Sequence, residues 1–286
     1  MRNLLKKYNI HPRKSLDQHF LIDKGAIKKE LDAAKIKKTE TILEIGPGPG
    51  TLTKELIKQA KKVIVIELDT SLADMLKKEY SDSIEIINAD ALKIEYPPFD
   101  KCVSNIPYSI SGKLTIKLGE LKKPAVLMYQ KEFAKRLIAN PGEKEYSKIS
   151  VMAQYYFTPE YITKVSKTSY YPVPKVDSAI VRLTPKKKNQ KIKDEEIFKK
   201  TVSALFMHKN QKAKKAFYHS RHIFGLDKTD AKKTAESMPE AETKVRDLDI
   251  DKIAKISNYL ALLYMGFFLN FQAAPSKIDK HTLVEP

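Results

Sequence analysis

This sequence of 286 residues contains one cysteine and no tryptophan. A single thiol, Cys102, excludes a disulfide framework and is typical of a reducing compartment, so we expect a cytoplasmic protein. The amino-terminal residues have no long apolar core followed by small residues, which argues against a secretory signal. The longest apolar stretch, residues 259–271, is broken by Gly266 and Asn270 and is shorter than the roughly 20 residues of a membrane span. We therefore expect no membrane association.

Negative charge is also scarce, because 35 Asp and Glu stand against 53 Lys and Arg, for a formal net charge of +18. Such a surplus favours a polyanionic partner, and nucleic acid is the first candidate. A generally Lys-rich surface would give the same balance, so the charge alone does not decide. No Cys or carboxylate stands at ligand spacing from His208, His219 or His222, and we predict no metal site.

Short runs rich in Val and Ile alternate with longer segments of helical periodicity in the first part of the chain. This alternation predicts a doubly wound α/β fold, in which helices cover a mainly parallel sheet. Leu52, Leu56 and Ala60 recur at helical spacing after the first strand, and residues 72–80 repeat the pattern after the second. Seven strands are expected, at residues 41–45, 63–66, 84–87, 102–104, 125–129, 151–157 and 176–183.

The composition of the sequence changes at Thr184, where Pro185 and three consecutive lysines interrupt the alternation of strand and helix patterns. The remainder of the chain is Lys-rich with helical spacing, and we expect amphipathic helices near residues 197–205 and 250–260. We predict an α/β domain over residues 1–184, a small helical domain over residues 185–270 and a tail over residues 271–286. The lysines at 186–188 suit either contact with RNA or a solvated hinge, and the sequence does not separate the two.

A glycine-rich segment, EIGPGPG at residues 44–50, follows the first expected strand and precedes a helix. Glycines such as Gly46 let the backbone turn tightly and approach a bound nucleotide, so the segment is a candidate cofactor loop. Thr51 stands where a dinucleotide-binding fingerprint has Gly or Ala, which disfavours a nicotinamide cofactor. A purely structural turn has a similar composition, and the interpretation needs support from other residues.

Acidic residues end the next two strands. Glu67 lies about 20 residues after Gly46, where an acidic side chain accepts hydrogen bonds from ribose hydroxyls, although it could instead cap the next helix. We assign Glu67 to a ribose and Asp69 to the cap. Asp90 follows the third strand and is placed to accept a hydrogen bond from the exocyclic amine of a bound adenine.

The most informative segment is NIPYSIS at residues 105–111, directly after the fourth strand, at the edge where open α/β sheets bind ligands. The exocyclic amine of a base is a weak nucleophile, because its lone pair is delocalised into the ring. The side-chain oxygen of Asn105 and the backbone carbonyl of Pro107 can accept its N–H groups and orient the lone pair, while Tyr108 stacks on the base. An Asn-capped turn is the structural alternative, which the position after a nucleotide loop disfavours.

Together these segments resemble the ribosomal RNA adenine dimethyltransferase family, with EIGPGPG at 44–50, NIPYSIS at 105–111, YYPVPKVDSAIVRL at 170–183 and QHFL at 18–21 as the shared motifs. The resemblance covers residues 12–183 and extends more loosely to residue 265. It implies a Rossmann-like methyltransferase fold and S-adenosylmethionine as cofactor. It also implies a cofactor pocket formed by His19, Leu21, Gly46, Glu67, Asp90 and Asn105.

The resemblance further implies that a second aromatic residue sandwiches the target base. Tyr170 stands where this residue is usually Phe, and its hydroxyl needs a partner when buried. His19 for the commoner Asn, Ile106 for the commoner Leu and Pro49 in the glycine loop are milder departures. None of these changes is expected to abolish activity.

The function implied is dimethylation of adenine N6 in small-subunit ribosomal RNA, with the pre-ribosomal small subunit as partner. We expect a monomer, since the sequence shows no heptad repeat and no large apolar face. Methylation of large-subunit RNA, a non-catalytic ribosome assembly factor, and methylation of a protein amide are the alternatives. The last of these more often shows Asn-Pro-Pro-Tyr at the equivalent segment.

A basic cluster in the second domain suits either a phosphate-facing surface or a solvated helix face, and comprises His208, Lys209, Lys212, Lys214, Lys215 and Arg221.

Overall fold

The computed structural model describes residues 2–187 and 191–272, with the side chains of residue 2 and residues 264–272 excepted. The chain divides into two compact units between residues 189 and 190. The boundary expected at residue 184 lies slightly earlier, because the last strand runs to Pro185 and the backbone N–H of Lys186 still bonds to Tyr156 in the first unit. The tail expected at residues 271–286 falls almost entirely outside the described residues.

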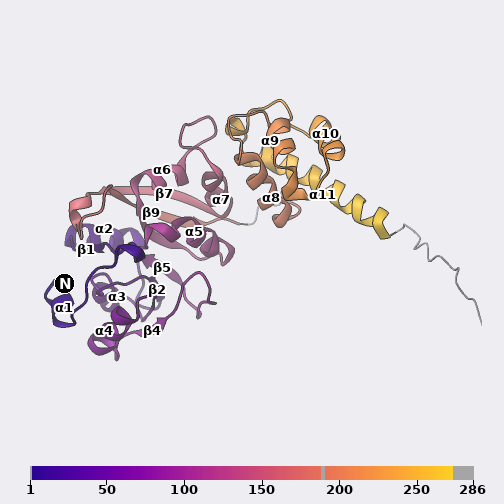
Figure 1. The fold of residues 1–286 in the computed structure, drawn as a ribbon. Helices are drawn as coiled ribbons and strands as arrows, with labels where there is room; N and C mark the ends of the chain where they lie inside the picture. The colour runs from indigo at the N-terminus through magenta and orange to yellow at the C-terminus, as the bar shows by residue number, and fades with distance from the viewer. Residues whose placement is uncertain (1, 188–190, 273–286) are drawn as a thin grey trace, which may run out of the picture. The chain divides into compact units, whose positions relative to one another are not determined.

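The first unit contains a seven-stranded sheet of order β4-β3-β2-β5-β6-β9-β7 (Figure 1). Strands β2 to β6 are parallel, whereas β9 is antiparallel to both of its neighbours. The expectation of a mainly parallel, seven-stranded, doubly wound sheet is confirmed. The strands are β2 (Thr41–Ile45), β3 (Lys62–Glu67), β4 (Glu85–Asn88), β5 (Lys101–Ser104), β6 (Ala125–Gln130), β7 (Phe157–Val165) and β9 (Ser178–Pro185).

Successive side chains of the strands enter two different cores, because they point to opposite faces of the sheet. Ile42 and Val63 pack toward α2 (Lys24–Ala34) and α3 (Thr53–Gln59), whereas Leu43 and Ile64 pack toward α5 (Ser111–Glu120), α6 (Lys131–Ile138) and α7 (Lys148–Tyr156). This burial on both faces explains the apolar runs at 42–43 in β2 and 63–66 in β3. Helix α4 (Thr70–Tyr80) packs its apolar stripe against residues of the amino-terminal segment.

One expected strand is wrong in its position. Residues 151–156 belong to α7, and the strand β7 begins only at Phe157. Ser147 and Ser150 form a reciprocal capping box that starts the helix, and the buried face of α7 packs against the sheet. The apolar run is therefore a buried helix face, which periodicity alone does not distinguish from a buried strand.

The amino-terminal segment runs from α1 (Arg2–Lys7) through a short helical turn, η1 (Lys14–Leu16), to β1 (Phe20–Leu21). β1 pairs antiparallel with β8 (Tyr170–Tyr171), so that Phe20 faces Tyr171 and Leu21 faces Tyr170. This two-stranded sheet connects the start of the chain to the segment before β9.

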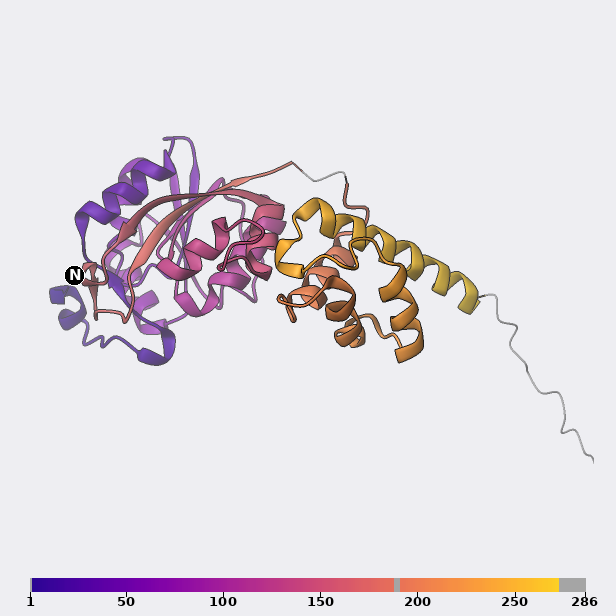
Figure 2. The same ribbon diagram turned by 90° about the horizontal axis from the view of Figure 1, so that it is seen from above.

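The second unit is helical, and Figure 2 shows its shorter helices gathered along the long yellow α11 (Ile250–Gln272). The helices expected near residues 197 and 250 are confirmed as α8 (Glu195–Phe206) and α11. Between them lie α9 (Ala213–His219) and α10 (Lys228–Ser237). Among the described helices, none combines the length and the apolar character that crossing a bilayer requires.

Candidate functional site

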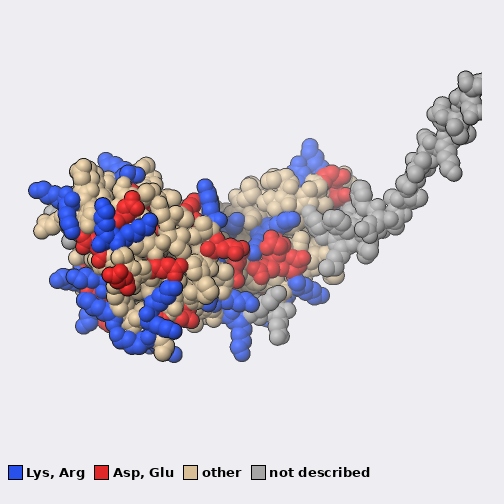
Figure 3. Space-filling view, turned by 90° about the horizontal axis from the view of Figure 1, so that it is seen from below, with Lys and Arg blue, Asp and Glu red and all other residues tan. Residues whose placement is uncertain are grey.

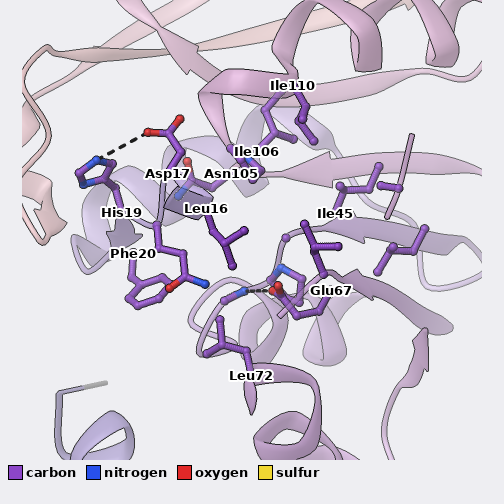
Figure 4. Close-up of a pocket in the computed structure, with 18 of the residues that line it drawn as sticks. Leu16, Asp17, His19, Phe20, Ile45, Glu67, Leu72, Asn105, Ile106 and Ile110 are labelled. Atoms are coloured by element: carbon purple, nitrogen blue, oxygen red, sulfur yellow. Dashed lines mark hydrogen bonds and ion pairs between the residues drawn. The ribbon is translucent and has the colours of Figure 1, made fainter. Parts of the chain in front are cut away.

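A cavity of about 230 Å³ opens at the carboxyl ends of β2 and β5, where the strand order reverses direction (Figure 4). Such a switch point is where open α/β sheets bind ligands. The segments after β2, β3, β4 and β5 contribute to its wall, together with residues 15–21 of the amino-terminal segment. The structure thus brings together residues from five separate parts of the chain.

The glycine loop begins the cavity wall and holds the backbone close to neighbouring groups. Gly46 adopts a positive φ of 68°, and a Cβ added there would lie 3.1 Å from the ring of Pro107. Gly48 has a φ of 56°, and its Cβ would lie 2.8 Å from the ring of Phe20. Both positions therefore need glycine for conformation and for space. The loop after β2 consequently packs against both the NIPYS loop (residues 105–109) and the amino-terminal segment.

Glu67 is at the end of β3 and is 5% exposed. Its two carboxylate oxygens accept hydrogen bonds from the backbone N–H groups of Gly48 and Asp69, at 3.1 and 2.9 Å. Burial raises the pKa of Glu67 to about 7, although these hydrogen bonds act in the opposite direction. The assignment of Asp69 to helix capping is confirmed, since its side chain accepts from the N–H of Ser71 at the start of α4.

Glu44 is a cavity residue to which the sequence analysis gave no role. Its side chain is 2% exposed, lines the cavity and accepts a hydrogen bond of 2.6 Å from the Thr53 hydroxyl. Burial raises its pKa to about 8, with a smaller contribution from Glu67. Glu44 is the first residue of the glycine-rich segment, and its position as an acidic residue near the end of a buried strand was the sequence signal that could have marked it as a site residue.

Asp90 and Asn105 lie on the cavity wall after β4 and β5. Asp90 accepts a hydrogen bond from the N–H of Leu92 through Oδ1, and its Oδ2 lies 3.8 Å from the ammonium of Lys93. The side-chain amide of Asn105 makes no hydrogen bond to any residue that the structure describes, and it faces the cavity in Figure 4. Its oxygen is therefore available to a ligand.

Pro107 and Tyr108 line the same cavity beyond Asn105. The Tyr108 hydroxyl lies 2.6 Å from that of Ser178, the first residue of β9. Burial raises the pKa of the Tyr108 phenol, so this group stays neutral at physiological pH. Its ring is thus attached to the rigid sheet at the hydroxyl end.

The amino-terminal segment closes one side of the cavity through several polar contacts. Gln18 donates a hydrogen bond to Asp69 at 3.0 Å, and the N–H of Ser109 donates to Asp17 at 3.2 Å. His19 and Leu21 both line the cavity, as the resemblance implies. The contacts of Gln18 and Asp17 join positions 51 and 92 residues apart, so sequence spacing gives no signal for them.

Tyr170 departs from the position that we expected for a residue that sandwiches a base. It is 2% exposed, does not line the cavity, and belongs to the core between α2 and the sheet with Leu21 and Ile180. Its hydroxyl is buried close to those of Ser178 and Tyr108, and burial raises its pKa. Pairing of β1 with β8 places Tyr170 opposite Leu21, and its role as a second stacking residue stays a prediction.

The polar lining of the cavity contrasts with the charge of the chain. Four carboxylates line it, those of Asp17, Glu44, Glu67 and Asp90, and none of the lining residues is Lys or Arg, although the chain carries a net charge of +18. A cavity lined by carboxyl groups and apolar side chains, without Lys or Arg, suits a ligand that carries positive charge and offers no cationic side chain to a phosphate-rich nucleotide. These residues fit S-adenosylmethionine, which combines a sulfonium and an ammonium group with a ribose and an adenine.

The surface outside the cavity carries charges of both signs, with Lys and Arg spread over the face of the first unit drawn in Figure 3. In the second unit, Lys212 and Lys214 of the expected basic cluster both donate to Glu242, and these bonds lower the pKa of that carboxyl to about 2. His208 and His219 lie with ring centroids 5.4 Å apart. No group of three potential metal ligands occurs among the described residues.

A model of the ribosomal RNA adenine dimethylase family matches residues 9–262 of the chain. The chain is 44% identical over 263 residues to a probable ribosomal RNA small subunit methyltransferase A of Thermococcus sibiricus, covering 90% of this chain and 95% of that protein. A protein of the same name from Pyrococcus abyssi is 43% identical over 260 residues, with the same coverage.

Two crystal structures are similar over most of the chain. A dimethyladenosine transferase from Plasmodium falciparum has a TM-score of 0.71 and 30% identity, over 86% of this chain and 98% of that one. The 23S rRNA methyltransferase ErmE has a TM-score of 0.60 and 27% identity, over 85% of this chain and 99% of that one.

Proposed function

The chain belongs to the ribosomal RNA adenine dimethylase family, and from this we propose that it transfers methyl groups from S-adenosylmethionine to the N6 amine of adenine in small-subunit ribosomal RNA. The observation that carries this proposal is the adjacency of two features in one cavity. The acidic part, which includes Glu67 and Asp90, suits a cationic cofactor, and the unpartnered amide of Asn105 lies beside it on the NIPYS loop.

In the cofactor half of the cavity, Glu67 is held in position by two backbone N–H groups and accepts the ribose hydroxyls. Asp90 accepts from the cofactor adenine amine, and the apolar residues Ile45, Ile66 and Leu72 pack around the ring system. The cofactor supplies a methyl carbon activated by a positively charged sulfur. The carboxylates need no charge compensation from Lys or Arg, because the ligand itself is cationic.

In the acceptor half, the side-chain oxygen of Asn105 and the carbonyl of Pro107 accept the two N–H groups of the target amine. This holds the nitrogen lone pair toward the methyl carbon, so the contribution of these residues is orientation. The nitrogen becomes acidic only after it gains the methyl group, and the proton then passes to water. No charged side chain has to remove a proton beforehand.

We further propose that the substrate is a pre-ribosomal small subunit, that the enzyme acts in the cytoplasm, and that it is a monomer. The relatives named as small subunit methyltransferases support the choice of subunit. A second candidate substrate is large-subunit RNA, which the similarity to the 23S rRNA methyltransferase favours at lower identity and lower TM-score.

The test is transfer of labelled methyl from S-adenosylmethionine to unmethylated small and large subunits, followed by nucleoside analysis. We expect dimethyladenosine in small-subunit RNA only. Asn105→Ala should lower the rate about 100- to 1,000-fold, as is typical when one pre-organised hydrogen-bonding group is removed. Asn140→Ala, at an exposed position outside the cavity, is the matched control and should be unaffected. Binding to the subunit without transfer would support an assembly factor and contradict the proposal.

A further inference from the structure

The loop after β4, residues 89–100, contains no helix or strand, yet it supplies three consecutive residues of the cavity wall, with Asp90 in the middle. Asp90 stabilises one turn of this loop. Its Oδ1 accepts the N–H of Leu92 and its backbone carbonyl accepts the N–H of Lys93, each at 2.9 Å. Oδ2 is therefore the atom of Asp90 that is left for the cofactor adenine, and its direction depends on how firmly the rest of the loop is held.

Lys117, on helix α5, binds this loop and does not itself line the cavity. Its ammonium donates to the backbone carbonyls of Ala91 and Ile94, at 2.9 and 2.5 Å. The ammonium also lies 4.2 Å from the centre of the Tyr96 ring, and the Tyr96 hydroxyl donates to the same carbonyl of Ala91 at 2.7 Å. One side chain thus joins three points of the loop, at positions 91, 94 and 96.

The contacts of Lys117 differ from those of a surface lysine. It forms no ion pair with any residue that the structure describes, and its ammonium is used on two carbonyls and a ring. Burial lowers its pKa, and the charge of Asp90 acts in the opposite direction. Hydrogen bonds from a charged donor are roughly twice as strong as neutral ones. Because the loop has no backbone ladder of its own, these bonds are the main restraint on its shape.

Helix α5 is a rigid support for this contact. It begins directly after the NIPYS loop, and its residues Leu114 and Leu118 are fully buried in the core under the sheet. We propose that Lys117 is a positioning residue for the cofactor: by fixing the carbonyls of the loop it directs Oδ2 of Asp90 at the exocyclic amine of the cofactor, and so sets the selectivity for an adenine ring. This inference rests on the proposed function.

The test measures selectivity for the base by calorimetry, as the ratio of the Kd of S-inosylhomocysteine to that of S-adenosylhomocysteine. The inosine compound has a carbonyl oxygen in place of the amine, and two acceptors then face each other at Asp90. We expect the unmodified protein to bind it about 10- to 150-fold more weakly, the range for a hydrogen bond to a charged group. In Lys117→Met the carbonyls lose both donors, and the ratio should fall toward 1, by about fivefold or more.

Two further variants separate positioning from a general loss of charge or stability. Lys117→Arg can donate to both carbonyls and lie over the Tyr96 ring, so it should keep the ratio within about threefold of the unmodified protein. Lys113→Met, at an exposed position of the same helix, is the matched control and should leave the ratio unchanged. A purely structural role of Lys117 would weaken the binding of both compounds equally.

An unchanged ratio in Lys117→Met would overturn the proposal, and so would a ratio near 1 in the unmodified protein. Should Lys117→Met not fold, Tyr96→Phe decides, because it removes one donor to the Ala91 carbonyl and keeps the ring. Its ratio should fall by about 2- to 10-fold, and no change would overturn the proposal. If the unmodified protein binds neither compound and transfers no methyl group, the proposed function itself fails, which is a different outcome from equal ratios.

Discussion

Glu30, on α2, provides a quantitative test of the energetics of this fold. Its side chain is fully buried, and neither carboxylate oxygen has a hydrogen-bond partner in the described structure. Burial raises its pKa from 4.5 to about 8, with a smaller contribution from Glu44. The folded protein must therefore hold Glu30 protonated near neutral pH, or leave a buried charge without compensation.

The direction of the pKa shift of Glu30 decides whether stability rises or falls with pH. Because the folded state binds the proton more tightly than the unfolded chain, stability from this group is complete below pH 4.5 and falls as the pH rises toward about 8. At 1.36 kcal/mol for each pKa unit, a shift of about 3.5 units corresponds to a loss of at most about 5 kcal/mol by pH 8. The pKa values of Glu44 and Glu67 are also raised, so these residues keep part of the pH dependence of the unfolding free energy when Glu30 is replaced.

The measurement is urea unfolding of the protein and of Glu30→Gln and Glu30→Leu between pH 5 and 8. Each variant should reduce the pH slope of the unfolding free energy by up to about 1.4 kcal/mol per pH unit. The Leu variant should also be more stable at pH 5, by about 1 to 3 kcal/mol, since it removes an unpaired buried polar group. Asp32→Asn, at an exposed position of the same helix, is the control. An unchanged slope in both Glu30 variants would refute the reasoning.

Three further predictions concern the cavity and the second unit. Gly48→Ala should weaken cofactor binding measured by calorimetry and lower the free energy of unfolding by about 1 to 3 kcal/mol. Gly225→Ala is the control, because this glycine also has a positive φ but lies in open space; it should cost only the backbone strain and leave the cofactor Kd unchanged. Equal effects of the two substitutions on stability and on the cofactor Kd would contradict the role of packing at Gly48. Thr53→Val should lower stability by about 1 to 3 kcal/mol in thermal or urea unfolding, because Glu44 loses its hydrogen bond, and a neutral result would contradict this. Removal of residues from 190 onward should weaken binding to small subunits in sedimentation assays more than binding of S-adenosylmethionine, and equal losses would contradict a recognition role for the second unit.

Much of the fold is encoded in local patterns of the sequence. The central residues of β2 and β3, at 42–43 and 63–66, are all apolar because both faces of the sheet are covered, and that pattern predicts parallel strands between helices. The glycine loop, Glu67 and Asn105 were recognisable because strands of a parallel sheet all end at one edge, where their following residues meet. Position along the chain was enough to place these residues at a common cavity.

Other features depend on contacts between distant segments, which no local pattern encodes. The apolar run at residues 151–157 suits a buried helix or a buried strand, and its capping and packing decided for the helix. An aromatic residue at position 170 suits either a base-stacking site or the protein core, and only the pairing of β1 with β8 places Tyr170 in the core. The contact of His19 with Tyr108 joins residues 89 positions apart in the sequence. Sequence periodicity reports which face of an element is apolar, whereas the partner of that face is set by how the whole chain packs.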